Sequence, residues 1–364
     1  MNFADTKKFP VVSVVMSVRN GMPYLHDAMT SILSQSLRNF EIIILDNAST
    51  DASVECIKSF NDSRIHLIKN EKDIGLSASL NRGFSLAKGK YIARMDADDI
   101  SLPQRLELQV AFLEAHPDIG LCGGAYEVFG IWNGVCHPPL HASDILANVF
   151  FQTPFAHPAV MYRKEMWDRN HLKYDESLVL TQDYKMWCEV CFFFKEKTAN
   201  LSEVILKYRL HENNETQSKV DRLNHEMSSC YKEILTSLCR KAGMSSSDAD
   251  NYVSENILWH EMLSQRKKIG SLRELKMSGY WMEKLQNIYM ASGCQCPNLF
   301  QKALYQRWIA CCKSLFPKKI GAIFIFYFFV RKIHVHGIII ETTKIFLSDF
   351  FQAIIGKLKK SLRR

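Results

Sequence analysis

The chain has 364 residues, of which 47% are apolar and 23% charged, and it carries a net charge of +8. These proportions are those of a globular protein and exclude a disordered chain. Eleven irregularly spaced cysteines and the lack of a secretory leader favour the reducing cytosol over a disulfide-bonded secreted fold.

Apolar runs alternate with helical patterns along the first quarter of the chain. Short apolar or β-branched runs predict strands at residues 11–16, 40–45, 65–68 and 91–95. Apolar residues at helical spacing predict intervening helices at residues 25–33, 52–60 and 75–87. This alternation with short links predicts an α/β fold with a largely parallel, doubly wound sheet.

Polar side chains follow the carboxyl ends of three of these strands. Asn20 follows the first strand, Asp46 the second and Asp96 the fourth. Because these ends share one edge of a parallel sheet, the side chains should converge on one crevice. Asp96, Asp98 and Asp99 place three carboxylates within four residues, and their mutual repulsion favours a bound divalent cation. A solvated acidic turn that caps the next helix is the alternative.

Four segments of this region form a recognisable set. They are VVMSVRN at 14–20, LDNASTD at 45–51, GLSASLNRG at 75–83 and ARMDADD at 93–99. In this order and spacing they resemble glycosyltransferase family 2, nucleotide-sugar transferases of the GT-A fold. The resemblance extends over residues 10–215 and implies an inverting, metal-dependent sugar transfer.

The resemblance implies roles for individual residues. Asp46 resembles the acid that hydrogen-bonds the uracil base of the donor, and Asp96 the acid near its ribose and the metal. Asp98 resembles the direct ligand of Mn²⁺ or Mg²⁺, whose charge neutralises the diphosphate leaving group. Ser17 and Asn20 belong to the first donor-binding segment.

Two residues depart from the family pattern. Asn47 stands where many members carry a second Asp, and Leu80 stands where many carry Arg. The second departure removes an arginine expected at the donor phosphate. Arg82, or failing that Arg94, is expected to take its place.

The region after Asp99 supplies the remaining candidates. Asp183 resembles the last acid of the family's Glu-Asp-Tyr type motif, the catalytic base, with Gln182 in place of the Glu. At a helix N-terminus its pKa is expected to be lowered and the group ionised, although a plain helix cap is the alternative. His211 is expected to complete the metal shell or bind a phosphate oxygen, with a solvated loop histidine as the alternative. His157 is expected to be structural.

A Gly/Pro-rich loop at residues 129–142 is expected to handle the acceptor. It carries Trp132, which suits either a sugar ring or a buried anchor of the loop.

The chain is expected to have three parts: a transferase domain at residues 1–217, a helical domain at 218–312 and a tail at 313–364. The tail holds eleven Lys and Arg against Glu341 and Asp349, so it carries the whole positive excess of the chain. Its apolar helical stripe and its cations predict binding to an anionic membrane surface. A hairpin packed on the domain is the alternative.

The sequence thus predicts transfer of a sugar from a nucleotide-sugar, with UDP expected, to a lipid-linked oligosaccharide of O-antigen, capsule or lipopolysaccharide. The expected place is the cytoplasmic face of the cell membrane, with peripheral attachment and no nucleic-acid partner. A sugar-1-phosphate nucleotidyltransferase would want a more Gly-rich loop than residues 17–24 provide. A non-catalytic membrane-surface adaptor would not need Asp96, Asp98 and Asp183 together.

Overall fold

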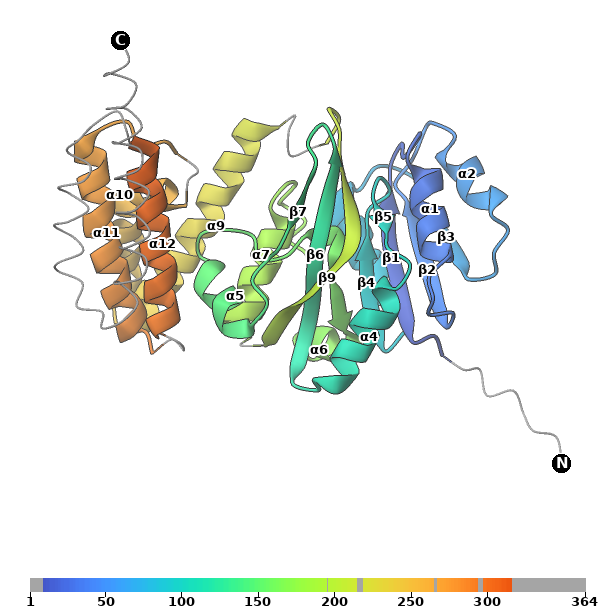
Figure 1. Cartoon of the computed structure of the whole chain (residues 1–364), viewed down its shortest axis with the longest axis horizontal. Coiled ribbons are helices and arrows are strands. Elements are labelled where there is room, and N and C mark those ends of the chain that lie inside the picture. Colours follow the sequence, from blue (N-terminus) through green and yellow to red (C-terminus); the bar gives the residue numbers. More distant parts are fainter. Residues whose placement is uncertain (1–8, 195, 215–218, 265–266, 294–296, 316–364) are drawn as a thin grey trace, which may run out of the picture. The chain divides into compact units, whose positions relative to one another are not determined.

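The computed structural model describes residues 9–194, 196–214, 219–264, 267–293 and 297–315. The chain divides after Leu238 into two compact units. The first unit is built on a nine-stranded sheet with the order β3-β2-β1-β4-β8-β6-β9-β5, and β7 pairs with β6 (Figure 1). The predicted tail, apart from its first three residues, lies outside the described residues.

The N-terminal half of the first unit follows the predicted alternation. Its elements are β1 (Val12–Val18), α1 (Leu25–Leu33), β2 (Phe40–Asp46), α2 (Ser53–Ser59), β3 (Ile65–Lys69), α3 (Gly75–Leu86) and β4 (Tyr91–Met95). The pairings β1–β2, β2–β3 and β1–β4 are all parallel. Val18 pairs with Asp46 and Met16 with Met95, so these strands end at one edge.

The other half of the sheet is mixed rather than parallel. Its elements are β5 (Ile100–Ser101), α4 (Arg105–Ala115), β6 (Ile119–Gly130), β7 (Gly134–Cys136), α5 (Ala142–Asn148), η1 (His157–Ala159), β8 (Met161–Arg163), α6 (Lys164–Arg169), α7 (Gln182–Cys188), the π-helical turn η2 (Glu189–Phe193) and β9 (Lys197–Leu210). Strand β8 runs antiparallel to both β4 and β6. The regular strand–helix crossover stops after α4, so the later strands are free to pair in either direction.

The longest strand is β9, which is parallel to β6 and lies beside it throughout (Figure 1). The sequence predicts only residues 204–208 as a strand here, because polar Asn200 and Glu203 interrupt the apolar pattern. The pairing contains register shifts near Gly124 and Ala125. The C-terminal end of β9 returns to the acidic turn after β4, through the antiparallel pairing of Ser101 with Leu206.

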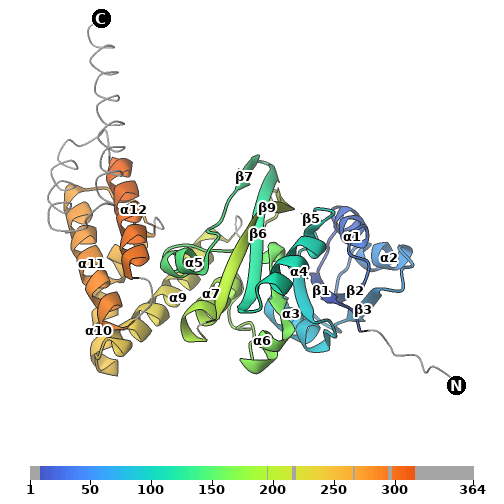
Figure 2. The same ribbon diagram turned by 60° about the horizontal axis from the view of Figure 1, so that its bottom comes forward.

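The core lies between the sheet and its helices. Helix α3 packs on β1 and β2, and α4 packs on β6 and β9 (Figure 2). Every residue of β2 and β4 is buried, as expected of strands covered on both faces. Helix α4 buries Leu106 and Leu113, and it also buries the polar Arg105 and Gln109.

The division between the units falls within helix α9 (Val220–Lys241), not at the expected boundary after residue 217. From Glu226 onward, one side of α9 is buried within the first unit. Tyr231 donates to the carbonyl oxygen of Phe151 at 3.2 Å, and its ring packs edge-to-face on Tyr184. These contacts across a long sequence separation decide where the unit ends.

Three whole helices of the described chain lie in the second unit. They are α10 (Ser246–Leu263), α11 (Leu272–Ala291) and α12 (Pro297–Leu315). Helix α11 begins with a capping box between Ser271 and Glu274, and Trp281 and Leu285 on it are buried. Among the residues that the structure describes, no helix is long and apolar enough to cross a membrane.

Candidate active site

A cleft of about 1030 Å³ opens at the carboxyl ends of the strands in the first unit. Several of the residues singled out from the sequence line it, among them Ser17, Asp96, Asp98 and Asp183. These side chains come from β1, the turn after β4 and the start of α7. The parallel register of β1 and β4 brings the first three to one edge, as the sequence predicts.

The acidic turn after β4 gathers three carboxylates. Oxygens of Asp96, Asp98 and Asp99 lie within 4.8 Å of one another. Asp99 is buried, and its Oδ1 accepts a hydrogen bond of 2.8 Å from the backbone N–H of Arg209. Its Oδ2 is buried without a partner among the described groups. Burial, followed by repulsion from Asp96 and Asp98, raises the pKa of Asp99 well above its usual range.

These residues fit a divalent cation. Three clustered carboxylates supply the hard oxygen ligands that Mn²⁺ and Mg²⁺ prefer, and the cation would offset their mutual repulsion. The unpaired Oδ2 of Asp99 is the kind of buried acceptor that requires a partner. These are the three acids that the sequence places together, and in the fold Asp99 is the most buried of them.

Arg94 is the cation built into this cluster. It is buried, it lines the cleft, and it forms an ion pair with Asp96. Burial raises the pKa of Asp96, and the ion pair opposes that shift. Of the two arginines considered for the donor phosphate, Arg94 therefore lies in the cleft.

Arg82 has a different place. Its guanidinium donates to Asn70 Oδ1 and to the carbonyl oxygen of Lys69, and it does not line the cleft. The expectation that Arg82 binds the donor has no support from this geometry. The guanidinium of Arg82 is instead occupied by acceptors at the end of β3 and directly after it.

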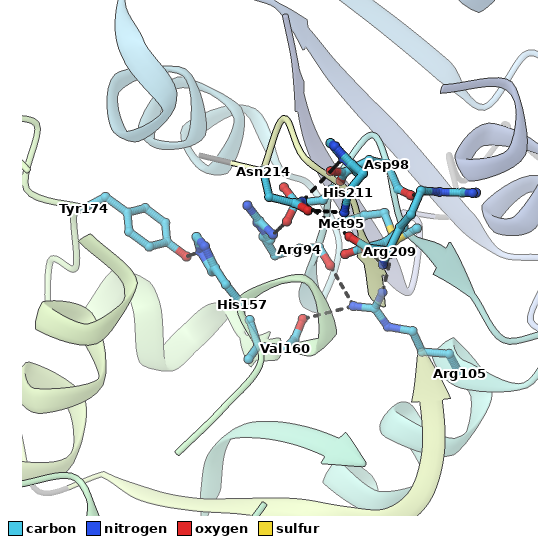
Figure 3. A network of polar contacts seen from close by, with 12 residues as sticks. Arg94, Met95, Asp98, Arg105, His157, Val160, Tyr174, Arg209, His211 and Asn214 are labelled. Carbon is cyan, nitrogen blue, oxygen red and sulfur yellow. Dashed lines mark hydrogen bonds and ion pairs between the residues drawn. The ribbon is translucent and has the colours of Figure 1, made fainter. Parts of the chain in front are cut away.

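His211 joins the end of β9 to the acids. Its Nε2 lies 3.0 Å from Asp98 Oδ2, and its Nδ1 is buried without a partner among the described groups. Asn214 Oδ1 accepts from the backbone N–H of His211 and holds the turn (Figure 3). His211 does not line the cleft itself, but it contacts the acid expected to bind the metal.

Asp183 begins α7 and faces the cleft from a different element. Its Oδ1 accepts from the backbone N–H of Tyr184 at 2.7 Å. Burial nevertheless raises the pKa of Asp183 to about 6, with Arg94 lowering it and Asp96 raising it. The expected lowering of this pKa is wrong. Desolvation by the surrounding protein outweighs the hydrogen bond that Asp183 accepts at the N-terminal end of this seven-residue helix.

The two remaining donor-side candidates shape the turns around the cleft. Asn20 has a positive φ of 51°, and its Oδ1 accepts from Thr50 N at 2.8 Å. Asp46 is buried and accepts from Ser49 N at 3.2 Å. Neither residue lines the cleft.

Other residues line the same part of the cleft. Asn47 donates to Asp73 Oδ1 at 2.5 Å, and Arg19 forms an ion pair with Asp73. All three line the cleft. In the sequence, Asn47 is only a departure from the family pattern, and no role at the cleft is predicted for it.

His157 lies in the η1 turn at the wall of the cleft. Its Nε2 is hydrogen-bonded to the Tyr174 hydroxyl at 3.0 Å, and that hydroxyl to Tyr162 at 2.9 Å. Burial, and then the nearby Arg94, lower the pKa of His157 well below its usual range, so the ring is neutral. A buried, bonded ring of this kind agrees with the structural role expected for it.

Arg105 is a residue that sequence reasoning missed. It is fully buried under β4 and donates to the carbonyl oxygens of Arg94 at 2.7 Å and Val160 at 3.4 Å (Figure 3). It thereby ties the strand that ends in the acids to the turn that carries His157. An arginine in the first turn of a helix gives no signal of such burial.

The comparisons with known proteins agree with this site. Residues 13–172 match the family described as Glycosyl transferase family 2. The Bacillus subtilis protein EpsE, named as a glycosyltransferase, is 38% identical over 211 residues, which cover 55% of this chain and 73% of EpsE. This chain belongs to glycosyltransferase family 2. It is therefore a glycosyltransferase, and the nucleotidyltransferase and adaptor alternatives are set aside.

Solved structures share the fold of this glycosyltransferase. Residues 1–349 of S. aureus TarS, in complex with UDP-GlcNAc, superpose with a TM-score of 0.56 at 15% identity, over 82% of this chain and 89% of that one. The mannosyltransferase PcManGT from Pyrobaculum calidifontis, in complex with GDP-Man and Mn²⁺, gives 0.51 at 15% identity, over 86% and 89%. The GT-A fold expected from the sequence is confirmed.

Proposed function

We propose that this glycosyltransferase moves a sugar from a UDP-sugar to a hydroxyl of a lipid-linked oligosaccharide, with inversion at the anomeric carbon. One observation carries the proposal. The acidic turn and Asp183 face one cleft from different elements, and both Arg94 and Asp96 influence the pKa of Asp183. A site for a diphosphate and a site for a proton acceptor therefore lie within electrostatic reach of each other.

Asp96 and Asp98 would hold Mn²⁺ or Mg²⁺, with Asp99 and His211 supporting them. When bound, the cation neutralises the diphosphate and makes it a better leaving group. The Mn²⁺ in PcManGT supports this assignment, and the UDP-GlcNAc in TarS supports a UDP donor. Arg94 holds Asp96 in place.

Asp183 is the proposed base. It takes the proton of the acceptor hydroxyl, whose oxygen forms the new bond to the anomeric carbon. The bond from that carbon to the diphosphate oxygen breaks on the opposite face, and UDP leaves with the electron pair. A base with a pKa of about 6 is ionised at neutral pH and holds a proton better than an ordinary aspartate does.

The proposal of a lipid-linked acceptor rests on the positive charge of residues 313–364. Their cations and apolar stripe suit the anionic inner face of a cell membrane, where bacterial surface polysaccharides such as O-antigen or capsule are extended. Peripheral attachment there would bring the cleft to its acceptor.

The test uses the full-length protein with Mn²⁺ or Mg²⁺ and a panel of UDP-sugars and GDP-sugars. We expect UDP release from one UDP-sugar, stimulated by a lipid extract and abolished by a chelator. NMR of the product should show an inverted anomeric configuration. Release of GDP alone, turnover unaffected by the chelator, or a retained configuration would contradict the proposal.

A further inference from the structure

Among the described residues that line the cleft, Trp132 is the most exposed large apolar side chain. Trp132 lies in the turn between β6 and β7, lines the cleft and is 53% exposed. Four of the other five tryptophans of the chain are buried, and Trp259 is half-buried. Exposure of an indole costs hydrophobic free energy, so an open indole at an active-site cleft suggests a ligand.

The indole is held against the backbone. A Cβ atom placed on Gly134 would lie 2.5 Å from Cη2 and 2.7 Å from Cζ2 of Trp132, so the ring rests directly on this glycine. The turn itself is anchored. Ile131 N donates to the carbonyl oxygen of Leu210 at 3.0 Å, and Gly130 N donates to Asn133 Oδ1 at 3.3 Å. The ring is therefore positioned before any ligand binds, which reduces the entropy cost of binding.

The turn lies away from the strand expected to bind the nucleobase. Asp46 ends β2, and the sheet order places β1, β4 and β8 between β2 and β6. At about 4.8 Å per strand, β2 and β6 are roughly 19 Å apart across the sheet. The anchor of the turn on Leu210 places it next to the end of β9, where His211 contacts Asp98.

We infer that Trp132 is a stacking platform for the acceptor sugar, and this inference rests on the proposed function. A pyranose ring presents a face of C–H groups that packs on the flat indole, while its hydroxyls remain free to hydrogen-bond. Pro138 and Pro139 also line the cleft and add apolar surface to it. The acceptor class is a pyranoside with such a C–H face.

The test measures acceptor binding separately from donor chemistry. The probes are the methyl β-glycosides of glucose, galactose and N-acetylglucosamine, with UDP and Mn²⁺ present. Their binding is measured by tryptophan fluorescence and by saturation-transfer NMR. We expect one probe to quench the fluorescence and to receive saturation on its C–H face. Trp132→Ala should abolish both signals, and Trp132→Phe should retain the saturation transfer.

Two matched variants sharpen the comparison. Ile131→Ser changes the adjacent residue, which is also exposed and apolar but does not line the cleft, so binding should be unchanged. Gly134→Ala should displace the indole and weaken binding without removing the ring. In turnover, Trp132→Ala should raise the acceptor KM about tenfold or more, with hydrolysis of the donor by water unchanged.

The outcomes are separable from those of the proposed function. UDP affinity and donor hydrolysis report on the proposed function and need no acceptor. If no glycoside binds the wild type, or if Trp132→Ala binds it equally well, the inference is wrong. Loss of UDP affinity in Trp132→Ala would overturn it in favour of base stacking, and loss of vesicle binding alone would overturn it in favour of membrane contact.

Discussion

The carboxylates at and behind the cleft face opposite chemical demands, although burial shifts their pKa values in the same direction. Burial raises the pKa of both Asp99 and Asp183. A bound cation would reverse this effect at Asp99, which lies within the cluster, by favouring the ionised form. Asp183, on another element, would keep a raised pKa suited to accepting a proton.

The first prediction concerns the metal ligand Asp98. Asp98→Ala should abolish turnover and the metal-dependent part of UDP binding, because it removes a carboxylate from the centre of the cluster and the partner of His211. Calorimetry of UDP with and without Mn²⁺ measures the effect. Asp118→Ala, an exposed acid paired with Lys197, is the control. Tight UDP binding by Asp98→Ala that a chelator does not change would refute the metal assignment.

The second prediction concerns the base. Asp183→Asn should preserve UDP and metal affinity but lower turnover about a hundredfold or more. In the wild type, turnover should rise with pH through about 6, because Asp183 is protonated and inactive below its raised pKa and ionised above it. The pH profile of kcat/KM, which reports on the free enzyme, should lose this rising limb in the variant. Near-normal turnover would leave Asp183 as a helix cap and require a test of Glu176, which also lines the cleft.

At the scale of elements, α9 supports the helix that carries the base. Glu226 on α9 accepts hydrogen bonds from Val179 N, from Leu180 N and from the hydroxyl of Thr181. These residues directly precede α7. The segment before the base thus depends on a helix more than forty residues later in the chain.

The third prediction follows from this contact. Glu226→Ala should lower the free energy of unfolding by roughly 3 kcal/mol, because it leaves buried donors without an acceptor. It should also reduce kcat, since the segment before Asp183 loses its anchor. Urea unfolding and turnover measure the two effects. Glu233 lies on the same helix as Glu226, is exposed, and forms an ion pair with the partly exposed Lys185 of α7, so Glu233→Ala should change stability little.

The pH dependence of the same contact has a definite sign. Burial alone would raise the pKa of Glu226, but the hydrogen bonds and Arg222 outweigh it, and the pKa is lowered. A lowered pKa means that the ionised form stabilises the fold above the ordinary value of 4.5, and that this stabilisation is lost as the pH falls further. The difference in stability between wild type and Glu226→Ala should therefore shrink in acid. A difference that is independent of pH would contradict the role of the carboxylate.

At the scale of the whole molecule, charge is separated from catalysis along the chain. The acids and Asp183 lie within the first unit, whereas the excess of Lys and Arg lies after residue 312. Each cation near an anionic leaflet contributes about 1 kcal/mol, and salt screens that attraction. The apolar stripe adds a contribution that salt does not remove.

The fourth prediction is that deleting residues 343–364 releases the protein from anionic vesicles. High salt should release only part of the intact protein. Transfer to a short soluble acceptor should survive the deletion, while transfer to a lipid-linked acceptor should fall. Sedimentation with vesicles of varied charge measures the binding. Equal binding to neutral and anionic vesicles, or no binding at all, would favour a packed hairpin over a membrane anchor.

The sequence alone was sufficient for the N-terminal half of the sheet and for the acids at its edge. Strand and helix patterns up to Met95 are local, and the parallel pairing of β1 with β4 then places Ser17 and Asp96 at one edge. The four segments, in their order along the chain, were also sufficient to identify the family, and the comparisons confirm it. These features depend on neighbours in the chain, so they can be read from it.

Tertiary structure decided the features that depend on burial and on distant partners. Arg105 is an ordinary helix residue until β4 and the turn before β8 cover it. The pKa of Asp183 is raised by the protein around it, although its position in the helix predicts the reverse. The end of the first unit moves into α9 because Glu226 and Tyr231 are buried against segments far back in the chain. Desolvation and long-range hydrogen bonding are properties of the packed chain, and no local pattern encodes them.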